Sequence, residues 1–516
     1  MKLNYKRTLL CGFAFFLITA FWQAYDATIP VILTNKFGMS QTWSGVIMAL
    51  DNVVAVLLLP IFGAISDKHK GKRGKRTPFI LVGTILAAVL LMGLSMVDNA
   101  QLKNISEVSK IDDPAALSVI YDSQSDRQLR TPDGKEFVLS EVFESKEAFM
   151  AVRTDDAEKD GSKENLYTQY VAPARRAYVA EKTAENSTEL ILFIVLLLAL
   201  LVSMSIFRSP AVALMPDVTV KPLRSKANAI INLMGNAGGI IVLLLGIVLA
   251  TSSVKNQLMS YTVYYGVIAA VMIVSLSIFL LTVKEKKWAE EMRNDSIKYH
   301  IEEETERESE KRKMTKSEKT SLIFILLSVA LWYFGYNAVT SKYAVYATNI
   351  LNKDYNLTMM IAQAAAIASY LPAGLIASKI GRKKTIIGGV VMLTGAFTAA
   401  SFMDASSPAI LMNVMFVLAG IGWATINVNS FPMAVEMCSG SDIGKYTGYY
   451  YTASMAAQMI TPFFSGILMD SIAETVLFPY AAVFSGLAIV TMLFVKHGDS
   501  KFESKKSILE NLSVDD

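Results

Sequence analysis

The feature that most constrains this chain is a succession of apolar runs, each about twenty residues long. An α-helix rises about 1.5 Å per residue, so a run of about twenty apolar residues crosses the hydrocarbon core of a bilayer. Hydrophobic residues make up 53% of the 516 residues, and a soluble protein of this size would not carry so many runs of this length. The sequence therefore predicts an all-α polytopic membrane protein.

Twelve such runs can be marked, which predicts twelve transmembrane helices. They lie at 8–33, 43–65, 77–97, 189–207, 227–250, 261–283, 320–340, 358–378, 385–403, 408–428, 445–468 and 474–495. A densely charged segment at 284–319 has the composition of a solvated helical linker and divides the runs six and six. We therefore expect a six-helix bundle over 1–283, the linker at 284–319, a second six-helix bundle over 320–497, and a tail at 498–516.

The lysines and arginines of the short loops predict the orientation in the membrane. They gather at 68–76, 221–226 and 379–384, which lie on one side, whereas the short loops of the other side carry few. Basic loops stay in the cytoplasm, so we expect both the N- and C-termini to be cytoplasmic. No cleavage site follows the first apolar run, which we interpret as a retained span and not a signal peptide.

A long polar insert at 98–188 then lies on the extracellular side. It is acidic on balance, and its apolar positions, among them Leu117, Phe137 and Leu139, could pack into a small cap. The sequence TPDG at 131–134 indicates a turn. Two interpretations stay open for the insert: a partly ordered loop with no part in the chemistry, or a lid over a transport pathway.

The two halves contain related motifs. GAISDKHKGKRGKRTPFILVG (63–83) and GLIASKIGRKKTIIGGV (374–390) each place a basic turn between two spans. FRSPAVALMPD (207–217) and NSFPMAVEMCS (429–439) each place a proline after the fourth span of their half, which predicts that the span ends there. Two six-span repeats across a linker are typical of a secondary transporter whose site lies between the halves.

At these residues the chain resembles the major facilitator superfamily. The stretch from Gly63 to Asp67 with the basic cluster after it looks like the superfamily's loop between spans two and three. RGKRTPFI (73–80) and RSPAVALMPD, with the amide- and glycine-bearing fifth span, are similar to the sucrose-transporter-like branch of the glycoside–pentoside–hexuronide:cation symporters. The resemblance implies the major facilitator fold and cation-coupled uptake of a glycoside, often a disaccharide. The chain departs from it in the 98–188 insert and in Ser378, which replaces the acid of the first-half turn.

Two carboxylates inside the predicted spans are candidates for cation coupling. An ionisable group in a span costs about 2.5–3.5 kcal/mol on insertion scales, so its presence points to function. Asp51 lies about 12 Å from the outer end of the second span by helical rise, and Asp26 lies in the first span. The two spans are antiparallel neighbours, so both acids could share one cavity. The alternative for Asp51 is a structural acid bonded to a neighbouring span, such as to an asparagine of the fifth.

No histidine lies in a predicted span, so proton coupling would depend on these carboxylates. A sodium ion could use the same acids with backbone carbonyls, and the choice between H⁺ and Na⁺ stays open. Within the spans, polar aromatic and amide side chains could bind sugar hydroxyls and pyranose faces. The candidate substrate-binding residues are Trp22, Gln23, Tyr25, Asn232, Asn236, Trp332, Tyr336, Asn337, Trp423 and Asn427. Trp332 and Tyr336 are four residues apart and are expected on one helix face.

Charged residues at repeat-related helix ends could form a cytoplasmic gate of ion pairs that break and form during transport. Arg208, expected at the end of the fourth span, could pair with Asp217 or another acid, or could be a simple membrane anchor. Asp67 could pair with Arg73 or Arg76. The candidate gate residues are Asp67, Arg73, Arg76, Arg208, Asp217 and Glu436.

The sequence thus predicts a secondary active transporter of the plasma (inner cell) membrane that takes up a sugar by symport. We find no nucleotide-binding loop, nucleophile motif or metal-ligand cluster, so we expect neither an enzyme nor a cofactor or metal. The expected partners are a small-molecule substrate and the lipid bilayer, without nucleic acid, and we expect a monomer. Two alternatives stay open: a transporter of another solute such as a drug, peptide or lipid, and a transport-inactive sensor that uses the outer insert.

Overall fold

The computed structural model describes residues 3–155, 165–220, 223–299, 315–435 and 443–498. Within these ranges twelve helices have 17 to 31 residues, and ten of them meet the length and composition of a membrane span. Six belong to the first half: α1 (Tyr5–Asn35), α2 (Gln41–Lys68), α3 (Thr77–Asn104), α9 (Thr188–Val218), α10 (Arg224–Val248) and α11 (Thr262–Thr282). Six belong to the second half: α13 (Lys316–Tyr346), α14 (Tyr355–Ile380), α15 (Arg382–Ala400), α16 (Ala409–Val435), α17 (Ile443–Ser471) and α18 (Leu477–Leu493).

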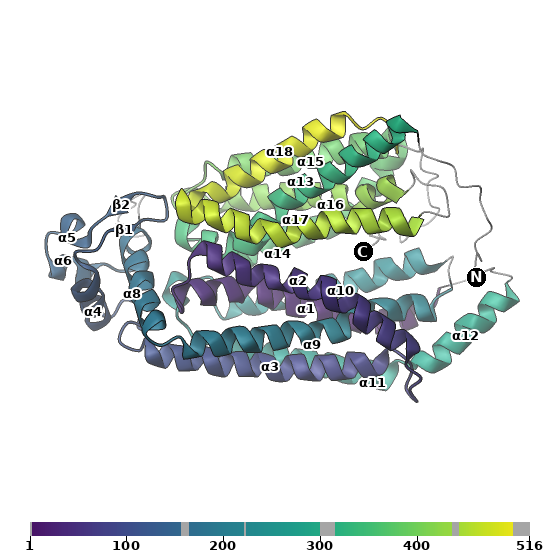
Figure 1. Ribbon diagram of the computed structural model, residues 1–516, viewed down its shortest axis with the longest axis horizontal. Helices are drawn as coiled ribbons and strands as arrows, with labels where there is room; N and C mark the ends of the chain where they lie inside the picture. The colour runs from purple at the N-terminus through teal and green to yellow at the C-terminus, as the bar shows by residue number, and fades with distance from the viewer. Residues whose placement is uncertain (1–2, 156–164, 221–222, 300–314, 436–442, 499–516) are drawn as a thin grey trace.

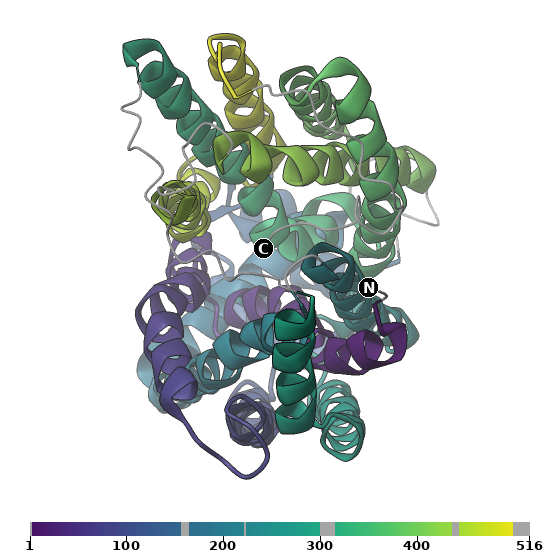
Figure 2. The same ribbon diagram turned by 90° about the vertical axis from the view of Figure 1, so that its right-hand side faces the viewer.

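The twelve-helix prediction is therefore confirmed. The two halves form two bundles that lie against each other, and an end-on view separates them clearly (Figures 1 and 2). The insert covers one end of the molecule, while α1 begins and α18 ends at the other (Figure 1). We call these the outer end and the cytoplasmic end, following the orientation that the basic loops predict.

Each half has its own apolar core, and small residues allow the helices of a half to pack closely. In α10, a Cβ on Gly238 would lie 2.4 Å from the carbonyl oxygen of Phe16 in α1, so only glycine permits this approach. The helices are apolar on nearly all sides because one side faces the bundle and the other faces lipid. Exposed apolar residues such as Leu281 and Val89 are therefore expected on the outer surface.

The predicted breaks at the prolines are wrong. Helix α9 continues through Arg208, Pro210 and Pro216 as far as Val218, and α16 continues through Pro432. A proline removes one backbone hydrogen bond, but within a bilayer neither water nor a loop can satisfy the other backbone groups. Continuing the helix costs less than ending it there.

The insert folds into a small unit with its own core. Its elements are α4 (Pro114–Gln124), β1 (Leu129–Arg130), β2 (Glu136–Phe137), α5 (Leu139–Val142), α6 (Lys146–Ala151), the π-helix η1 (Tyr167–Val171) and α8 (Ala172–Glu185). The TPDG turn joins β1 to β2, with Gly134 at φ +92°. Of the apolar residues expected to form a cap, Leu117, Phe137 and Leu139 are buried in this core.

Four short elements complete the described chain. They are η3 (Val254–Asn256), α12 (Glu285–Lys298), η4 (Ala347–Leu351) and η6 (Glu474–Val476). Helix α12 corrects the expectation of a wholly solvated linker, because Trp288 is buried in the core of the first half. Beyond α12, linker residues 300–314 lie outside the described ranges.

Candidate functional site

Two carboxylates from neighbouring helices mark the middle of the bundle. Asp26 of α1 and Asp51 of α2 are both partly exposed although they lie within long apolar helices. They are close enough for the charge of one to act on the other. Within the described part of the chain, the carboxylate of Asp26 makes no hydrogen bond or ion pair. The carboxylate of Asp51 accepts hydrogen bonds from Asn52, at 2.5 Å from its backbone N–H and 2.6 Å from its side-chain amide.

Arg208 belongs to this region and not to the cytoplasmic surface. Because α9 continues to Val218, Arg208 lies about 15 Å inside the helix from its cytoplasmic end by helical rise. Its guanidinium lies over the ring of Trp22, 5.6 Å from the centroid, and its charge acts on Asp51. The expected position of Arg208 at the end of the fourth span is therefore wrong, because the helix continues past it. Its part in a cytoplasmic gate stays a prediction.

The candidate residues of α1 continue from these charges toward the second half. Tyr25 packs edge-to-face on Trp22, with ring centroids 5.4 Å apart. The Trp22 Nε1 and Tyr25 hydroxyl atoms are buried and have no hydrogen-bond partner among the described residues. Gln23 accepts a hydrogen bond of 2.6 Å from the Nε2 of Gln363 in α14. This bond joins the two halves near the middle of the bundle, and Gln363 was missed by the sequence analysis although it is an amide inside an apolar span.

The second half contributes an aromatic pair. The rings of Tyr336 in α13 and Trp423 in α16 stack with centroids 3.5 Å apart and planes 2° apart. The charge of Asp26 acts on Tyr336, so this pair lies close to the acids of the first half. Asn337 and Asn427 beside the pair are partly exposed, and the Asn337 amide nitrogen has no partner among the described residues.

Trp332 does not join this group. It is fully buried in the core of the second half, whereas Tyr336 on the same side of the helix is partly exposed, so the side chain of Trp332 is not open to a substrate in this structure. Four residues along a helix correspond to a rotation of 40° beyond a full turn, which is enough to place Trp332 in the core while Tyr336 stays partly exposed. The predicted amides of α10, Asn232 and Asn236, are partly exposed.

The predicted cytoplasmic charges form a cluster within the first half. The guanidinium of Arg76, next to the start of α3, donates hydrogen bonds to Asp67 and Ser66 of α2 and, at 2.7 Å, to Asp217 of α9. Lys75 lies 3.2 Å from Asp217. Of the two partners predicted for Asp67, Arg73 and Arg76, the structure thus pairs it with Arg76. The cluster connects three helices of one half, and among the described residues its bonds do not cross to the other half.

The remaining gate candidates lie elsewhere. Arg73 is exposed on the surface near the start of α3. Glu436 lies outside the described residues. The role of these residues in gating stays a prediction.

The outer ends of the two halves are joined directly. The carboxylate of Asp470 in α17 accepts hydrogen bonds from the backbone N–H groups of Gln41 and Thr42, at 2.8 and 2.7 Å, and from the Thr42 hydroxyl at 2.6 Å. A buried lysine of α13, Lys342, donates to the backbone carbonyl of Gln41 at 2.7 Å. Gly45 allows α2 to lie against α17, because a Cβ there would lie 2.0 Å from the carbonyl oxygen of Pro462. These contacts close the molecule at its outer end.

The insert adds to this closure by bonding to the second half. Arg130 donates to the backbone carbonyls of Asp470 and Ser471, at 2.8 and 3.0 Å. Glu474 donates its backbone N–H to Pro132 at 2.8 Å, and its carboxylate pairs with Arg176 at 2.9 Å. The insert is part of the first half by sequence, so these bonds also join the halves.

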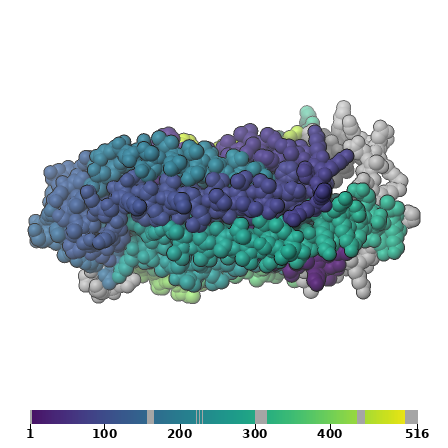
Figure 3. All heavy atoms as spheres, turned by 90° about the horizontal axis from the view of Figure 1, so that it is seen from below, coloured from purple at the N-terminus to yellow at the C-terminus, as the bar shows by residue number. Residues whose placement is uncertain are grey.

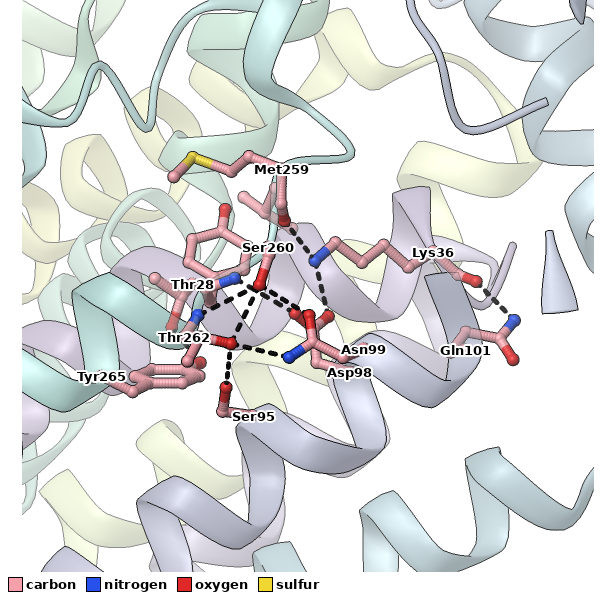
Figure 4. Close-up of polar contacts among 12 residues, drawn as sticks. Thr28, Lys36, Ser95, Asp98, Asn99, Gln101, Met259, Ser260, Thr262 and Tyr265 are labelled. Atoms are coloured by element: carbon pink, nitrogen blue, oxygen red, sulfur yellow. Dashed lines mark hydrogen bonds and ion pairs between the residues drawn. The ribbon is translucent and has the colours of Figure 1, made fainter. Parts of the chain in front are cut away.

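A buried ion pair supports the base of the insert and was not found by the sequence analysis. Lys36, directly after α1, lies 2.5 Å from Asp98 of α3, and both side chains are fully buried (Figure 4). The ammonium also donates to the backbone carbonyl of Met259 at 2.6 Å and lies over the ring of Tyr261. By sequence, Lys36 follows the first predicted span and Asp98 begins the insert. The only signal in the sequence is that each charge borders an apolar run.

Comparison with known proteins identifies the family. Residues 14–480 match the family described as MFS_1 like family. The chain belongs to this family. It is thus a multi-pass membrane protein of the major facilitator superfamily, consistent with the plasma membrane location that the sequence predicts.

Individual relatives are distant. The chain is 25% identical over 146 residues to the MFS-type transporter ppzB of Metarhizium rileyi, a match that covers 28% of this chain and only 30% of that relative. Among solved structures, a D-xylose–proton symporter is similar with a TM-score of 0.57 at 14% identity, over 96% of this chain and 99% of that one. The nucleoside transporter NupG is similar with a TM-score of 0.52 at 12% identity, over 95% of this chain and all of that one. At these identities the likeness shows the fold alone.

Proposed function

We propose that this transporter takes up a sugar or glycoside, such as a disaccharide, together with a proton or a sodium ion, by alternating access. The observation that carries the proposal is the carboxylate of Asp26, which has no bonded partner among the described residues and lies near Asp51 in the middle of the bundle. A charged group at this depth is costly unless it is neutralised. Binding of a proton or a sodium ion would neutralise it and so couple the ion to the conformational change.

The surroundings of the acids support a polar, ring-containing substrate. The Tyr336–Trp423 pair offers an aromatic face of the kind that packs on the C–H surface of a pyranose. The amides of Gln23 and Gln363 bond to each other between the halves, and the same groups could bond to substrate hydroxyls instead. A substrate bridging the two halves at this point is what alternating access requires. The sucrose-transporter-like branch, suggested by residues 63–83 and 207–240, agrees with this assignment.

A second candidate function is transport of a solute other than a sugar, such as a drug, a peptide or a lipid. The parallel Tyr336 and Trp423 rings would also stack on a planar heterocycle, and a nucleoside transporter is among the similar folds. The sensor alternative would place ligand binding on the outer insert and would make the membrane acids dispensable for its output.

Uptake into proteoliposomes tests these alternatives. The purified full-length protein is supplied with labelled sucrose, maltose or a nucleoside under an imposed proton gradient, a sodium gradient, or neither. The variants D26N and D51N are compared with D126N, whose exposed carboxylate lies in the insert. Because asparagine keeps the shape of aspartate without its charge, the comparison isolates the charge in the membrane.

We expect gradient-driven uptake of a sugar by the parent protein and by D126N, and its loss in D26N or D51N while exchange of substrate without a gradient remains. Nucleoside uptake without sugar uptake would favour the second candidate. Full uptake by both D26N and D51N would contradict coupling through these acids. Absence of uptake of any solute by folded protein, with ligand binding retained by the insert, would favour the sensor.

A further inference from the structure

We propose that a basic hollow at the cytoplasmic end of the first half binds the headgroup of an anionic phospholipid. The hollow lies where the loop before α3 meets the end of α11 and the start of α12. Five cationic side chains line it: Lys72, Arg73, Lys284, Lys286 and Lys287. Glu290 is the single acid among its lining residues. Basic pockets on the cytoplasmic side of transmembrane helices are suited to anionic lipid headgroups.

The cations are not neutralised by the protein itself. Within the part of the chain that the structure describes, the side chains of Lys72, Arg73, Lys284 and Lys286 make no ion pair or hydrogen bond. Lys287 lies 3.9 Å from Glu291, at the limit of an ion pair. All five cations are exposed, so an approaching phosphate would meet positive charge on several sides. Five like charges around one space repel each other, and a bound anion would relieve this repulsion.

A buried carboxylate holds the two sides of the hollow together. Glu285, the first residue of α12, accepts hydrogen bonds of 2.7 to 2.9 Å from the backbone N–H groups of Lys75, Arg76 and Thr77, and from the Thr77 hydroxyl. Trp288, one turn later, is buried against the first half. The loop that carries Lys72 is thus fixed beside the helix that carries Lys286. The N-terminal amides of α3 are already occupied, so the lysine and arginine side chains are the groups left for the headgroup.

Apolar surface beside the hollow favours a lipid over a soluble anion. Helices α3 and α11 lie side by side along the face shown in Figure 3. Exposed apolar side chains on both run from the hollow toward the outer end, with Val82 on α3 and Leu281 on α11 at 49% and 82% exposure. Leu280 and Val283 line the hollow itself. A phospholipid would place its phosphate among the lysines and its acyl chains along these helices, whereas a soluble anion would leave the apolar surface unused.

Native mass spectrometry of the full-length protein in detergent tests this site. The probes are phosphatidylglycerol and phosphatidylcholine with the same acyl chains, added in equal amounts. The test variant K72Q/K286Q removes one charge from each side of the hollow. The matched control K316Q/K319Q removes two exposed lysines from the first turn of α13, also at the cytoplasmic end. A parallel titration adds inorganic phosphate at constant ionic strength.

We expect the parent protein and the control to retain one phosphatidylglycerol in preference to phosphatidylcholine, and K72Q/K286Q to bind it about tenfold or more weakly. Equal retention by K72Q/K286Q would overturn the site. Equal weakening in the control would overturn it too, because the effect would then follow net charge alone. Displacement of the lipid by millimolar phosphate would overturn the choice of a lipid in favour of a soluble anion.

Discussion

The outer and cytoplasmic ends of this molecule use their polar residues in different ways. Among the described residues, the hydrogen bonds between the halves lie from Gln23 outward, through Asp470, Lys342 and the insert. At the cytoplasmic end, the cluster around Arg76 connects helices of the first half only. The structure therefore describes a state that is closed at its outer end. In the proposed alternating-access cycle the outer contacts must break, whereas the Arg76 cluster can move with its half as a rigid unit.

The insert makes this difference larger. It is anchored at its base by the buried Lys36–Asp98 pair, and it reaches the second half through Arg130 and Glu474. Every opening of the outer end must therefore also release the insert from α17 and η6. Opening of the outer end must break bonds between the halves, whereas among the described residues the Arg76 cluster bonds within one half, so variants at the two ends should differ in what they change. The following predictions test this contrast, beginning with the largest effect.

The largest effect is expected at the buried ion pair. Replacing Lys36 with methionine leaves the carboxylate of Asp98 buried without its partner, and breaking a buried pair in this way costs about 3–5 kcal/mol. We expect K36M to lower the thermal stability strongly or to abolish the yield of folded protein in detergent. Size-exclusion profiles and thermal unfolding of purified protein measure this.

A double variant provides the control for that prediction. In K36M/D98L both charges are replaced by apolar side chains of similar size, so no unpaired charge remains. Replacement of a whole buried pair is often neutral, and we expect this variant to recover much of the lost stability. If K36M alone is as stable as the parent protein, the pair is not what supports the outer end of the first half.

The second prediction concerns the contact between the halves. Asp470 accepts three hydrogen bonds from Gln41 and Thr42 of the other half, and a bond to a charged group contributes about 1.5–3 kcal/mol. D470N should weaken this contact and shift the population toward a state open at the outer end. Electron–electron distances between spin labels at Ser187 and Ala409 should then gain a longer component.

The matched control is D404N. Asp404 lies in a loop of the second half, and among the described residues its carboxylate bonds to Ser406 and Ser407 of its own loop. Its substitution should leave the distance distribution unchanged. An unchanged distribution in D470N would show that the carboxylate does not hold the outer end closed, and the contrast between the two ends would then depend on the remaining contacts, among them Lys342 with Gln41 and the insert.

The sequence predicted the features that depend on local composition. Twelve spans follow from apolar length, and the turn at 131–134 follows from the residues that turns require. The sequence failed where a residue's role depends on its neighbours in space. Arg208 was placed at a helix end because proline and arginine follow an apolar run, yet the helix continues past both. Hydropathy cannot show that Trp22 and Asp51 lie close enough to accommodate this charge inside the bundle.

The residues of the candidate site also differ in whether the sequence could predict them. Asp26 and Asp51 were found because a carboxylate in an apolar span is conspicuous in any sequence. The bond from Gln363 to Gln23 was not found, because it requires knowledge of which helices of the two halves meet. Trp332 and Tyr336 have the same sequence signal, and only the packing of the second half separates them.

The smallest effect is expected at the cytoplasmic end, where two acids bond to the same arginine. The prediction compares the substitutions of these two acids. Asp217 is 19% exposed and lies 2.7 Å from the Nε of Arg76, whereas Asp67 is 59% exposed. A solvated ion pair contributes little, about 0–1 kcal/mol, while a better-buried charged hydrogen bond contributes about 1.5–3 kcal/mol. D217N should therefore lower the unfolding temperature more than D67N does. Because both acids bond within the first half, neither substitution should change the Ser187–Ala409 distance that D470N lengthens. A shift of that distance in D217N would contradict the view that the cluster moves as a unit with its half. It would indicate that the Arg76 cluster controls the opening of the outer end.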